Sequence, residues 1–262
     1  MPLIHHVVAG TGSPPVVFVH GFACSQKDWR AQIDHFSARH TTVAVDLPGH
    51  GATPAAVEPA SIERCGSVVA DLLRARSLAP AVLVGHSMGC RVVLEAALRA
   101  PEHVAGIALV DGSRFAAAVA QVFETRFAAG DYRALVRGMF EQMFTTRSDA
   151  KTMAAAVQRA LDLPEAVGQA LLLSLVRYDM ESLGSALERV DRPLLALQTT
   201  FVDDRRVRTP MTAGQTTPYL EFVRAKVPGA RIEVLPGVGH FPQLDAPAET
   251  NRALASFIAT LA

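Results

Sequence analysis

The sequence predicts an α/β protein built on a mostly parallel sheet. Short apolar runs rich in β-branched residues recur along the chain, helix-like stretches separate them, and one run leads through a glycine-flanked turn directly into a helix. Strands that are apolar on both faces are typical of a parallel sheet covered by helices on both sides. The expected strands are Pro15–His20, Thr42–Asp46, Ala81–Val84, Gly106–Val110, Leu194–Leu197 and Ile232–Leu235.

Helical stretches fill the intervals between these runs. Pro101 follows the third of them and ends it, because proline cannot continue a helix. The expected helices are Trp29–Phe36, Ser61–Arg76, Arg91–Ala100, Pro218–Val227 and Pro247–Leu261.

The pattern changes between Gly112 and Val190, where helix formers dominate and aromatic residues and methionines are interspersed. We expect three to five helices here, inserted between two sheet strands. The predicted organisation is therefore a core of residues 1–111 and 191–262 and a helical cap of residues 112–190. Most of the apolar side chains in the cap can be explained by packing, but some, such as Phe140 and Phe144, are candidates for an apolar substrate pocket.

Composition and charge exclude several functional classes. The 262 residues contain 25 Lys and Arg against 25 Asp and Glu, so no basic excess indicates a nucleic-acid partner. No apolar run approaches the roughly 20 residues that span a bilayer, and no signal peptide is visible. The three cysteines form no regular framework, which favours a reduced, cytoplasmic protein without disulfides. We expect neither a metal site nor a cofactor.

Ser87 lies at the centre of the pattern G-x-S-x-G, between Gly85 and Gly89. A serine hydroxyl is a weak nucleophile and must stand clear of the backbone, where a base and a substrate can reach it. The two glycines allow strand and helix to pass closely enough for a strained turn to close. The N–H of Met88 then lies at a helix N-terminus, which favours negative charge.

Two further loops supply what a nucleophilic serine requires. His240 lies in a glycine-rich loop after the last expected strand, where imidazole can take the serine proton and later return it. Phe22 follows the first long strand in His20–Gly21–Phe22. If this loop lies beside Ser87, the N–H groups of Phe22 and Met88 can form an oxyanion hole, and the Phe22 side chain can contact substrate.

Together these segments resemble the α/β-hydrolase fold family in the order of its motifs. They are H-G at 20–21, D-L-P-G-H-G at 46–51, G-H-S-M-G at 85–89 and G-H-F-P at 239–242. The resemblance covers essentially the whole chain. It implies an eight-stranded, mostly parallel sheet flanked by helices, a nucleophilic Ser87, a basic His240, and an oxyanion hole from Phe22 and Met88.

The carboxylate that should orient His240 is left open by the sequence. Asp111 closes the apolar run Gly106–Val110, and some family members carry the acid at that strand end. The more usual place in the family, after Leu194–Gln198, offers Asp203 and then Asp204 as alternatives. Their neighbours Arg205, Arg206 and Arg208 also allow a simpler explanation for these two aspartates, as surface ion pairs.

The leading functional hypothesis is hydrolysis of a carboxylic ester or lactone of a small to medium, apolar substrate through an acyl-enzyme, as in serine carboxylesterases. Other chemistry on the same fold remains open: a carbon–carbon bond hydrolase, a perhydrolase or a cofactor-free dioxygenase. In that last group, too, the carboxylate stands at the strand end where Asp111 lies. A non-catalytic binding protein is disfavoured because Ser87, His240 and both turn glycines are present.

Overall fold

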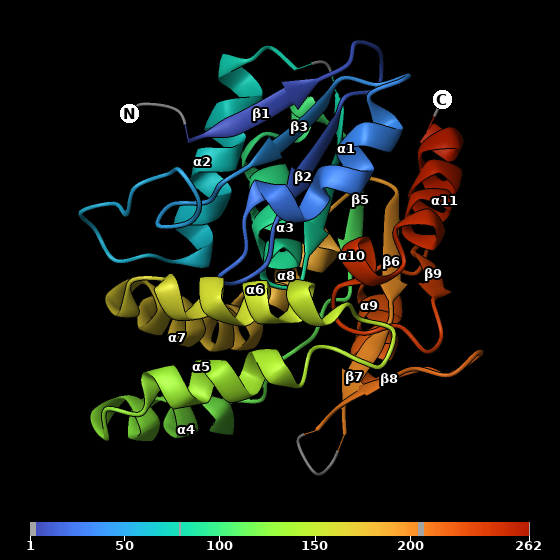
Figure 1. The fold of residues 1–262 in the computed structure, drawn as a ribbon. Coiled ribbons are helices and arrows are strands. Elements are labelled where there is room, and N and C mark those ends of the chain that lie inside the picture. Colours follow the sequence, from blue (N-terminus) through green and yellow to red (C-terminus); the bar gives the residue numbers. More distant parts are fainter. Residues whose placement is uncertain (1–3, 79, 204–206, 262) are drawn as a thin grey trace.

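The computed structural model describes residues 4–78, 80–203 and 207–261. A mostly parallel sheet runs through the middle of the molecule (Figure 1). Its strand order is β1-β3-β2-β4-β5-β6-β9; β1 is antiparallel to β3 and every other neighbouring pair is parallel. The strands are β1 His6–Ala9, β2 Val16–Val19, β3 Thr42–Val45, β4 Ala81–His86, β5 Val104–Val110, β6 Leu194–Gln198 and β9 Arg231–Val234.

The predicted fold class is confirmed, but the sheet has seven strands in the described part of the chain rather than eight. Only one antiparallel strand, β1, precedes β2 there. The remaining two strands, β7 Thr200–Val202 and β8 Arg208–Pro210, pair with each other as a separate antiparallel hairpin. Neither β1 nor this hairpin was among the strands expected from the sequence.

Helices cover both faces of the sheet, and the alternating side chains of each strand divide the core in two. Val17 and Val19 of β2 pack in one cluster with residues of α2 and α3, whereas Val16 and Phe18 pack in the other with residues of α1 and α11. This period-two alternation explains why the strands are apolar on both faces.

The predicted helices are present with small shifts at their ends; α3 begins at Met88, directly after Ser87. The short helix α10 was not predicted. The helices are α1 Arg30–Phe36, α2 Ile62–Ala75, α3 Met88–Arg99, α4 Ala118–Ala128, α5 Tyr132–Glu141, α6 Ala150–Asp162, α7 Glu165–Glu181, α8 Leu183–Arg189, α9 Pro218–Lys226, α10 Pro242–Asp245 and α11 Pro247–Ile258.

Five of these helices, α4 to α8, lie between β5 and β6 in the chain. Helices α4 to α7 gather below the sheet in Figure 1, on the same side as the β7–β8 hairpin. Helix α8 instead packs against α3. The helical segment thus extends from one end of the sheet back to its flank.

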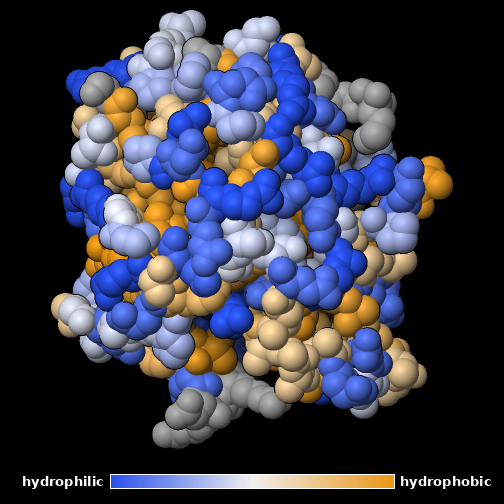
Figure 2. Space-filling model, turned by 180° about the vertical axis from the view of Figure 1, so that it is seen from behind, coloured by the Kyte–Doolittle hydropathy of each residue, from blue (hydrophilic) through white to orange (hydrophobic). Residues whose placement is uncertain are grey.

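The surface is an ordinary mixture of residue types on the face shown in Figure 2, where small hydrophobic groups are interspersed among hydrophilic residues. Within the described ranges, no helix has both the length and the apolar character needed to cross a membrane.

Candidate active site

The carboxyl ends of two neighbouring parallel strands place the first two site residues. Ser87 directly follows β4, Asp111 directly follows β5, and β4 pairs with β5 along its length. The backbone N–H of Ser87 donates to the carbonyl of Val110 at 2.9 Å, which ties the two strand ends together. His240 comes from the loop after β9 and reaches the same edge.

Ser87 has a strained backbone. Its φ of +54° and ψ of −112° lie in a region that residues with a side chain rarely adopt. The flanking glycines make the turn possible: a Cβ on Gly85 would lie 2.3 Å from the carbonyl oxygen of Gly89, and one on Gly89 would lie 2.5 Å from that of Val19. Close packing of strand and helix therefore requires glycine at both positions.

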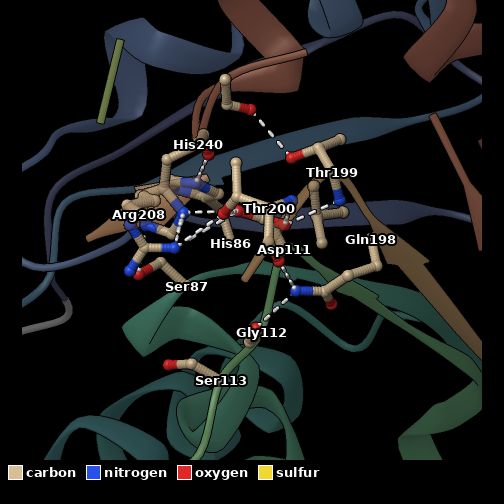
Figure 3. A network of polar contacts seen from close by, with 12 residues as sticks. His86, Ser87, Asp111, Gly112, Ser113, Gln198, Thr199, Thr200, Arg208 and His240 are labelled. Carbon is tan, nitrogen blue, oxygen red and sulfur yellow. Dashed lines mark hydrogen bonds and ion pairs between the residues drawn. The ribbon is translucent and has the colours of Figure 1, made fainter. Parts of the chain in front are cut away.

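Ser87, His240 and Asp111 form one continuous chain of contacts (Figure 3). The Oγ of Ser87 lies 2.9 Å from Nε2 of His240, and Nδ1 of His240 lies 2.6 Å from Oδ2 of Asp111. A proton on Nδ1 satisfies the carboxylate and leaves Nε2 as an acceptor for the serine hydroxyl. The side chains of His240 and Asp111 are 2% and 0% exposed, so water does not compete for the inner contact.

Asp111 is held as a carboxylate by several donors. The backbone N–H groups of Thr199 and Thr200 both donate to Oδ1 at 2.7 Å, and the hydroxyl of Thr200 donates to Oδ2 at 2.6 Å. Burial alone would raise the pKa of Asp111, but the hydrogen bond and charge of His240, with Arg208 and Thr200, lower it below its usual value. The fixed carboxylate in turn fixes the His240 ring.

The two alternative acids lie elsewhere or outside the described residues. Asp203 lies in the turn of the β7–β8 hairpin, where its carboxylate accepts the backbone N–H of Val207 at 2.9 Å. Asp204 lies outside the described residues. Within the described part, the carboxylate in contact with His240 is that of Asp111.

His240 is kept neutral at ordinary pH. Burial lowers its pKa most, the positive charge of Arg208 lowers it further, and Asp111 acts in the opposite direction; the result is a pKa of about 4. A neutral imidazole can accept a proton from Ser87. The adjacent His86 supports the loop, because its Nε2 lies 2.7 Å from the carbonyl oxygen of His240.

Arg208 corrects one expectation from the sequence. With Arg205 and Arg206 it offered Asp203 and Asp204 a simpler role as surface ion pairs, but its side chain is only 13% exposed and its Nη1 lies 3.7 Å from Oδ2 of Asp111. The pairing of β8 with β7 turns the side chain inward, and no strand was expected from the sequence at this position. Arg205 and Arg206 lie outside the described residues. Thr199 and Thr200 were also missed, although a polar pair directly after a buried strand was an available signal.

The loop of Phe22 lies against the serine turn. A Cβ on Gly21 would lie 3.1 Å from Cβ of Ser87, so this backbone passes directly over the turn. Side chains fix the loop, since His50 accepts the N–H of Ala23 at 3.1 Å and His20 lies 2.7 Å from the carbonyl oxygen of Gly21. Within the described residues, neither the N–H of Phe22 nor that of Met88 donates a hydrogen bond to the protein.

A cavity of about 480 Å³ lies between the segment after Asp111, helices α4 and α5, and the hairpin; of the residues around His240, Thr200 and Arg208 line it. Its walls are largely apolar, with polar groups at Thr200 and Arg208. The apolar lining comes mainly from Phe115, Val119, Phe123, Leu135, Met139 and Met143.

Phe140 and Phe144 are not among the described residues that line this cavity. Phe140 is fully buried, with its ring 6.5 Å from that of Phe22, and Phe144 stacks on Phe241 at 5.0 Å. They form an aromatic cluster next to His240, whose ring lies 5.4 Å from Phe241. In the structure, these two side chains pack against the loop that carries His240.

The three cysteines are buried, and Cys90 lies beneath the serine turn, with its Sγ 3.2 Å from the carbonyl oxygen of Gly85. Burial raises the pKa of Cys65 and of Cys90 to about 12, so neither thiol is a ready nucleophile. Within the described residues, no group of three or more His, Cys, Asp or Glu side chains is arranged to hold a metal ion.

In a comparison with known protein families, residues 16–253 match the α/β-hydrolase family. The chain belongs to the α/β-hydrolase family. A dihydrolipoyllysine-residue acetyltransferase component of an acetoin cleaving system from Pseudomonas putida is 26% identical over 96% of this chain, which spans 65% of that protein's length.

Solved structures of the family superpose closely on this one. A thermophilic esterase from Thermogutta terrifontis matches with a TM-score of 0.81 and 21% identity, covering 98% of this chain and 93% of its own. An enol-lactonase from Burkholderia xenovorans LB400 matches with a TM-score of 0.81 and 17% identity, covering 98% and 96%. At these identities the likeness establishes the shared fold.

Proposed function

We propose that this α/β-hydrolase cleaves carboxylic esters or lactones with Ser87 as nucleophile, His240 as general base and Asp111 as the orienting carboxylate. The observation that carries the proposal is the uninterrupted contact chain from Oγ of Ser87 through both ring nitrogens of His240 to Asp111. Each element has the property that its role needs: a partly exposed serine on a strained turn, a neutral imidazole, and a charged, fixed carboxylate.

The reaction proceeds in two halves. Ser87 Oγ attacks the substrate carbonyl while its proton passes to Nε2 of His240, and the tetrahedral intermediate expels the alcohol, which takes that proton. Water then attacks the acyl-serine with His240 again as base, and the collapse releases the acid and restores Ser87. Asp111 stabilises the imidazolium that forms in each half.

The N–H groups of Phe22 and Met88 are proposed to hold the developing oxyanion. Both are unused within the described part of the chain, and the loop of Phe22 packs on the serine turn. Met88 is also the first residue of α3, so the positive end of the helix dipole adds to its N–H. Two fixed donors of this kind are worth roughly several kcal/mol in the transition state.

Residues 112–190 are proposed to act as the cap that selects the substrate. The cavity beneath α4 and α5 has a size suited to a small or medium molecule and a mainly apolar wall. The esterase and lactonase folds that superpose on this chain agree with such substrates.

A cofactor-free dioxygenase is the second candidate, favoured by the position of Asp111 at the end of β5. Oxygen consumption with a hydroxyquinolone, in the absence of any ester turnover, would support it.

The test of the ester hydrolase uses p-nitrophenyl butyrate and a fluorophosphonate probe. Wild-type protein should release p-nitrophenol and be labelled at Ser87, and Ser87→Ala should abolish both. Ser185→Ala changes an exposed serine on α8 and should alter neither. Full turnover by Ser87→Ala would refute the assigned nucleophile, and folded wild-type protein that is not labelled would indicate a binding protein.

A further inference from the structure

Arg208 lies at the junction between the cavity and the proposed triad. It lines the cavity, and its Nη1 donates to the hydroxyl of Thr200 at 2.7 Å and lies 3.2 Å from Nδ1 of His240 (Figure 3). Since Nδ1 carries the proton that Asp111 accepts, both atoms of this last pair are donors and the contact is not a hydrogen bond. A group bound to Arg208 would thus lie next to the reacting residues.

The guanidinium makes far fewer contacts than it can. Nη1 forms its one true hydrogen bond, and within the described residues Nε and Nη2 have no hydrogen-bond partner. A guanidinium has five donors arranged to grip a planar anion with two parallel bonds. Neither Nε nor Nη2 is a buried atom without a partner in the described part; because Arg208 lines the cavity, a molecule bound there can reach both donors.

Asp111 does not supply the missing partner. Its oxygens already accept from two backbone N–H groups, from the hydroxyl of Thr200 and from His240, and the 3.7 Å to Nη1 of Arg208 is too long for a hydrogen bond. Arg208 is therefore held near the carboxylate by charge, with its remaining donors free.

The cavity that Arg208 lines is a positive environment. No aspartate or glutamate occurs among its described lining residues; Arg114 also lines it, but it is exposed and its guanidinium lies over the Phe222 ring. Tyr219 adds a hydroxyl that has no hydrogen-bond partner in the described part, packed so closely on the backbone that a Cβ on Gly112 would lie 2.2 Å from it. Low-dielectric walls around the Arg208 cation favour an anionic ligand.

The positive charge of Arg208 also disfavours proton transfer from Ser87 to His240 unless an anion neutralises it. When His240 takes the serine proton, the imidazolium stands 3.2 Å from Nη1 of Arg208, and two like charges so close raise the energy of that state. Asp111 offsets part of this repulsion, and an anion bound to Arg208 would reduce it further. A substrate that brings its own anion therefore gains both in binding and in proton transfer.

We propose that the substrate of this enzyme is an ester or lactone that also carries a carboxylate, and that Arg208 determines this specificity by binding the carboxylate through Nε and Nη2. The inference rests on the proposed ester hydrolysis and narrows its substrate class. The apolar cavity wall then contacts the rest of the substrate.

The test compares pairs of esters in which a carboxylate replaces one neutral group. The p-nitrophenyl hydrogen esters of succinate, glutarate and adipate carry a carboxylate where the butyrate, valerate and hexanoate esters have a methyl group. A second pair, 4-acetoxybenzoate and phenyl acetate, places the carboxylate on the leaving group instead. In one of these sets, wild-type kcat/KM should favour the anionic ester at least about tenfold, the size of one charge-assisted hydrogen-bond pair.

Variants assign the preference to Arg208. Arg208→Met should reduce the anionic-to-neutral ratio of kcat/KM by about tenfold or more, and Arg208→Lys should retain part of it. Arg224→Met, on an exposed arginine of α9 that pairs with Glu221, should leave the ratio unchanged. A wild-type enzyme that prefers the neutral ester in every pair, or an equal ratio in Arg208→Met, would overturn the proposal.

A binding measurement separates this proposal from the one on which it rests. Glutarate, titrated into wild-type protein, should raise Tm, and butyrate at the same concentration and ionic strength should not. If neutral esters are cleaved but glutarate does not bind, the specificity proposal fails while ester hydrolysis stands. If no ester is cleaved but glutarate binds through Arg208, ester hydrolysis fails while the anion site stands; if neither occurs, both fail.

Discussion

Arg91 and Asp179 form a doubly hydrogen-bonded ion pair inside the protein, with Nε–Oδ1 at 2.9 Å and Nη2–Oδ2 at 2.7 Å. Their side chains are 2% and 0% exposed. Arg91 also donates to the carbonyl oxygens of Ser87 and Ser113, and Asp179 accepts the N–H of Phe115. The pair thus connects the serine turn, the segment after Asp111 and helix α7.

Breaking this pair should weaken both the fold and the site. Asp179→Ala leaves the Arg91 guanidinium buried without its partner, and we expect a loss of about 3–5 kcal/mol in the free energy of unfolding, measured by urea denaturation. The kcat for p-nitrophenyl butyrate should fall as well, because the serine turn loses its brace. The double variant Arg91→Met/Asp179→Leu should regain most of the stability, and a single variant within 1 kcal/mol of wild type would contradict this role.

The carboxylate assignment can be tested with a matched pair of isosteric changes. Asp111→Asn presents an amide to Nδ1 of His240 and favours the tautomer that cannot accept the serine proton, so kcat should fall by about 10³- to 10⁴-fold. Asp203→Asn alters a residue of the hairpin turn and should leave kcat near the wild-type value. The reverse result would assign the role of the orienting acid to Asp203.

The sequence could predict the sheet and the neighbourhood of Ser87 because both follow from local rules. Apolar runs and glycine spacing are written in consecutive residues, and parallel strands that are neighbours end at one edge. The partner of His240 could not be chosen in this way, since Asp111 and Asp203 both follow buried strands. The choice depends on the β7–β8 hairpin, which carries Asp203 into its own turn.

The position of Arg208 was even harder to predict from the sequence. In the sequence it is one of several arginines beside two aspartates, a pattern typical of an exposed loop. Only the pairing of β8 with β7 turns its side chain toward Thr200 and His240. Three-residue strands carry too little apolar pattern to be recognised from sequence.

The pH dependence of the reaction should change when the charge of Arg208 is removed, because that charge lowers the pKa of His240. Burial, Arg208 and Arg91 lower the pKa of His240 to about 4, against the opposing effect of Asp111. The acid limb of kcat/KM for a neutral ester should therefore lie well below the usual histidine value of about 6.5. Arg208→Met should move the limb to higher pH and Arg208→Lys should not; identical limbs in all three proteins would exclude this influence.

Stability should fall as the pH is lowered from about 6.5 toward 4. Burial lowers the pKa of His20, His50, His86 and His240, to about 4 for His50 and about 3 for His86. In this range the unfolded chain binds protons that the folded chain does not, and each pKa unit of difference is worth about 1.4 kcal/mol. Urea denaturation midpoints measured at pH 7.5 and 5 should show this loss of stability. The loss should be smaller in His50→Asn than in wild type. His35→Asn, which alters an exposed residue, should lose as much as wild type.

Two helical glycines should respond in opposite directions to the same substitution. A Cβ on Gly89 in α3 would lie 2.5 Å and 2.8 Å from the carbonyl oxygens of Val19 and His20, both backbone atoms of the strand end that carries the Phe22 loop. A Cβ on Gly138 in α5 would meet nothing within 4 Å. Gly89→Ala should therefore force α3 away from β2 and disturb Ser87, with losses in both stability and kcat.

Gly138→Ala should instead stabilise the protein by roughly 1 kcal/mol, because alanine restricts the unfolded chain and fits an open helical position. Thermal unfolding and p-nitrophenyl butyrate turnover, measured on both variants, check the contrast. If Gly89→Ala kept wild-type Tm and kcat, the close approach of strand and helix could not be what requires glycine beside the serine. A loss of stability in Gly138→Ala would contradict the open space that the structure shows beside Gly138.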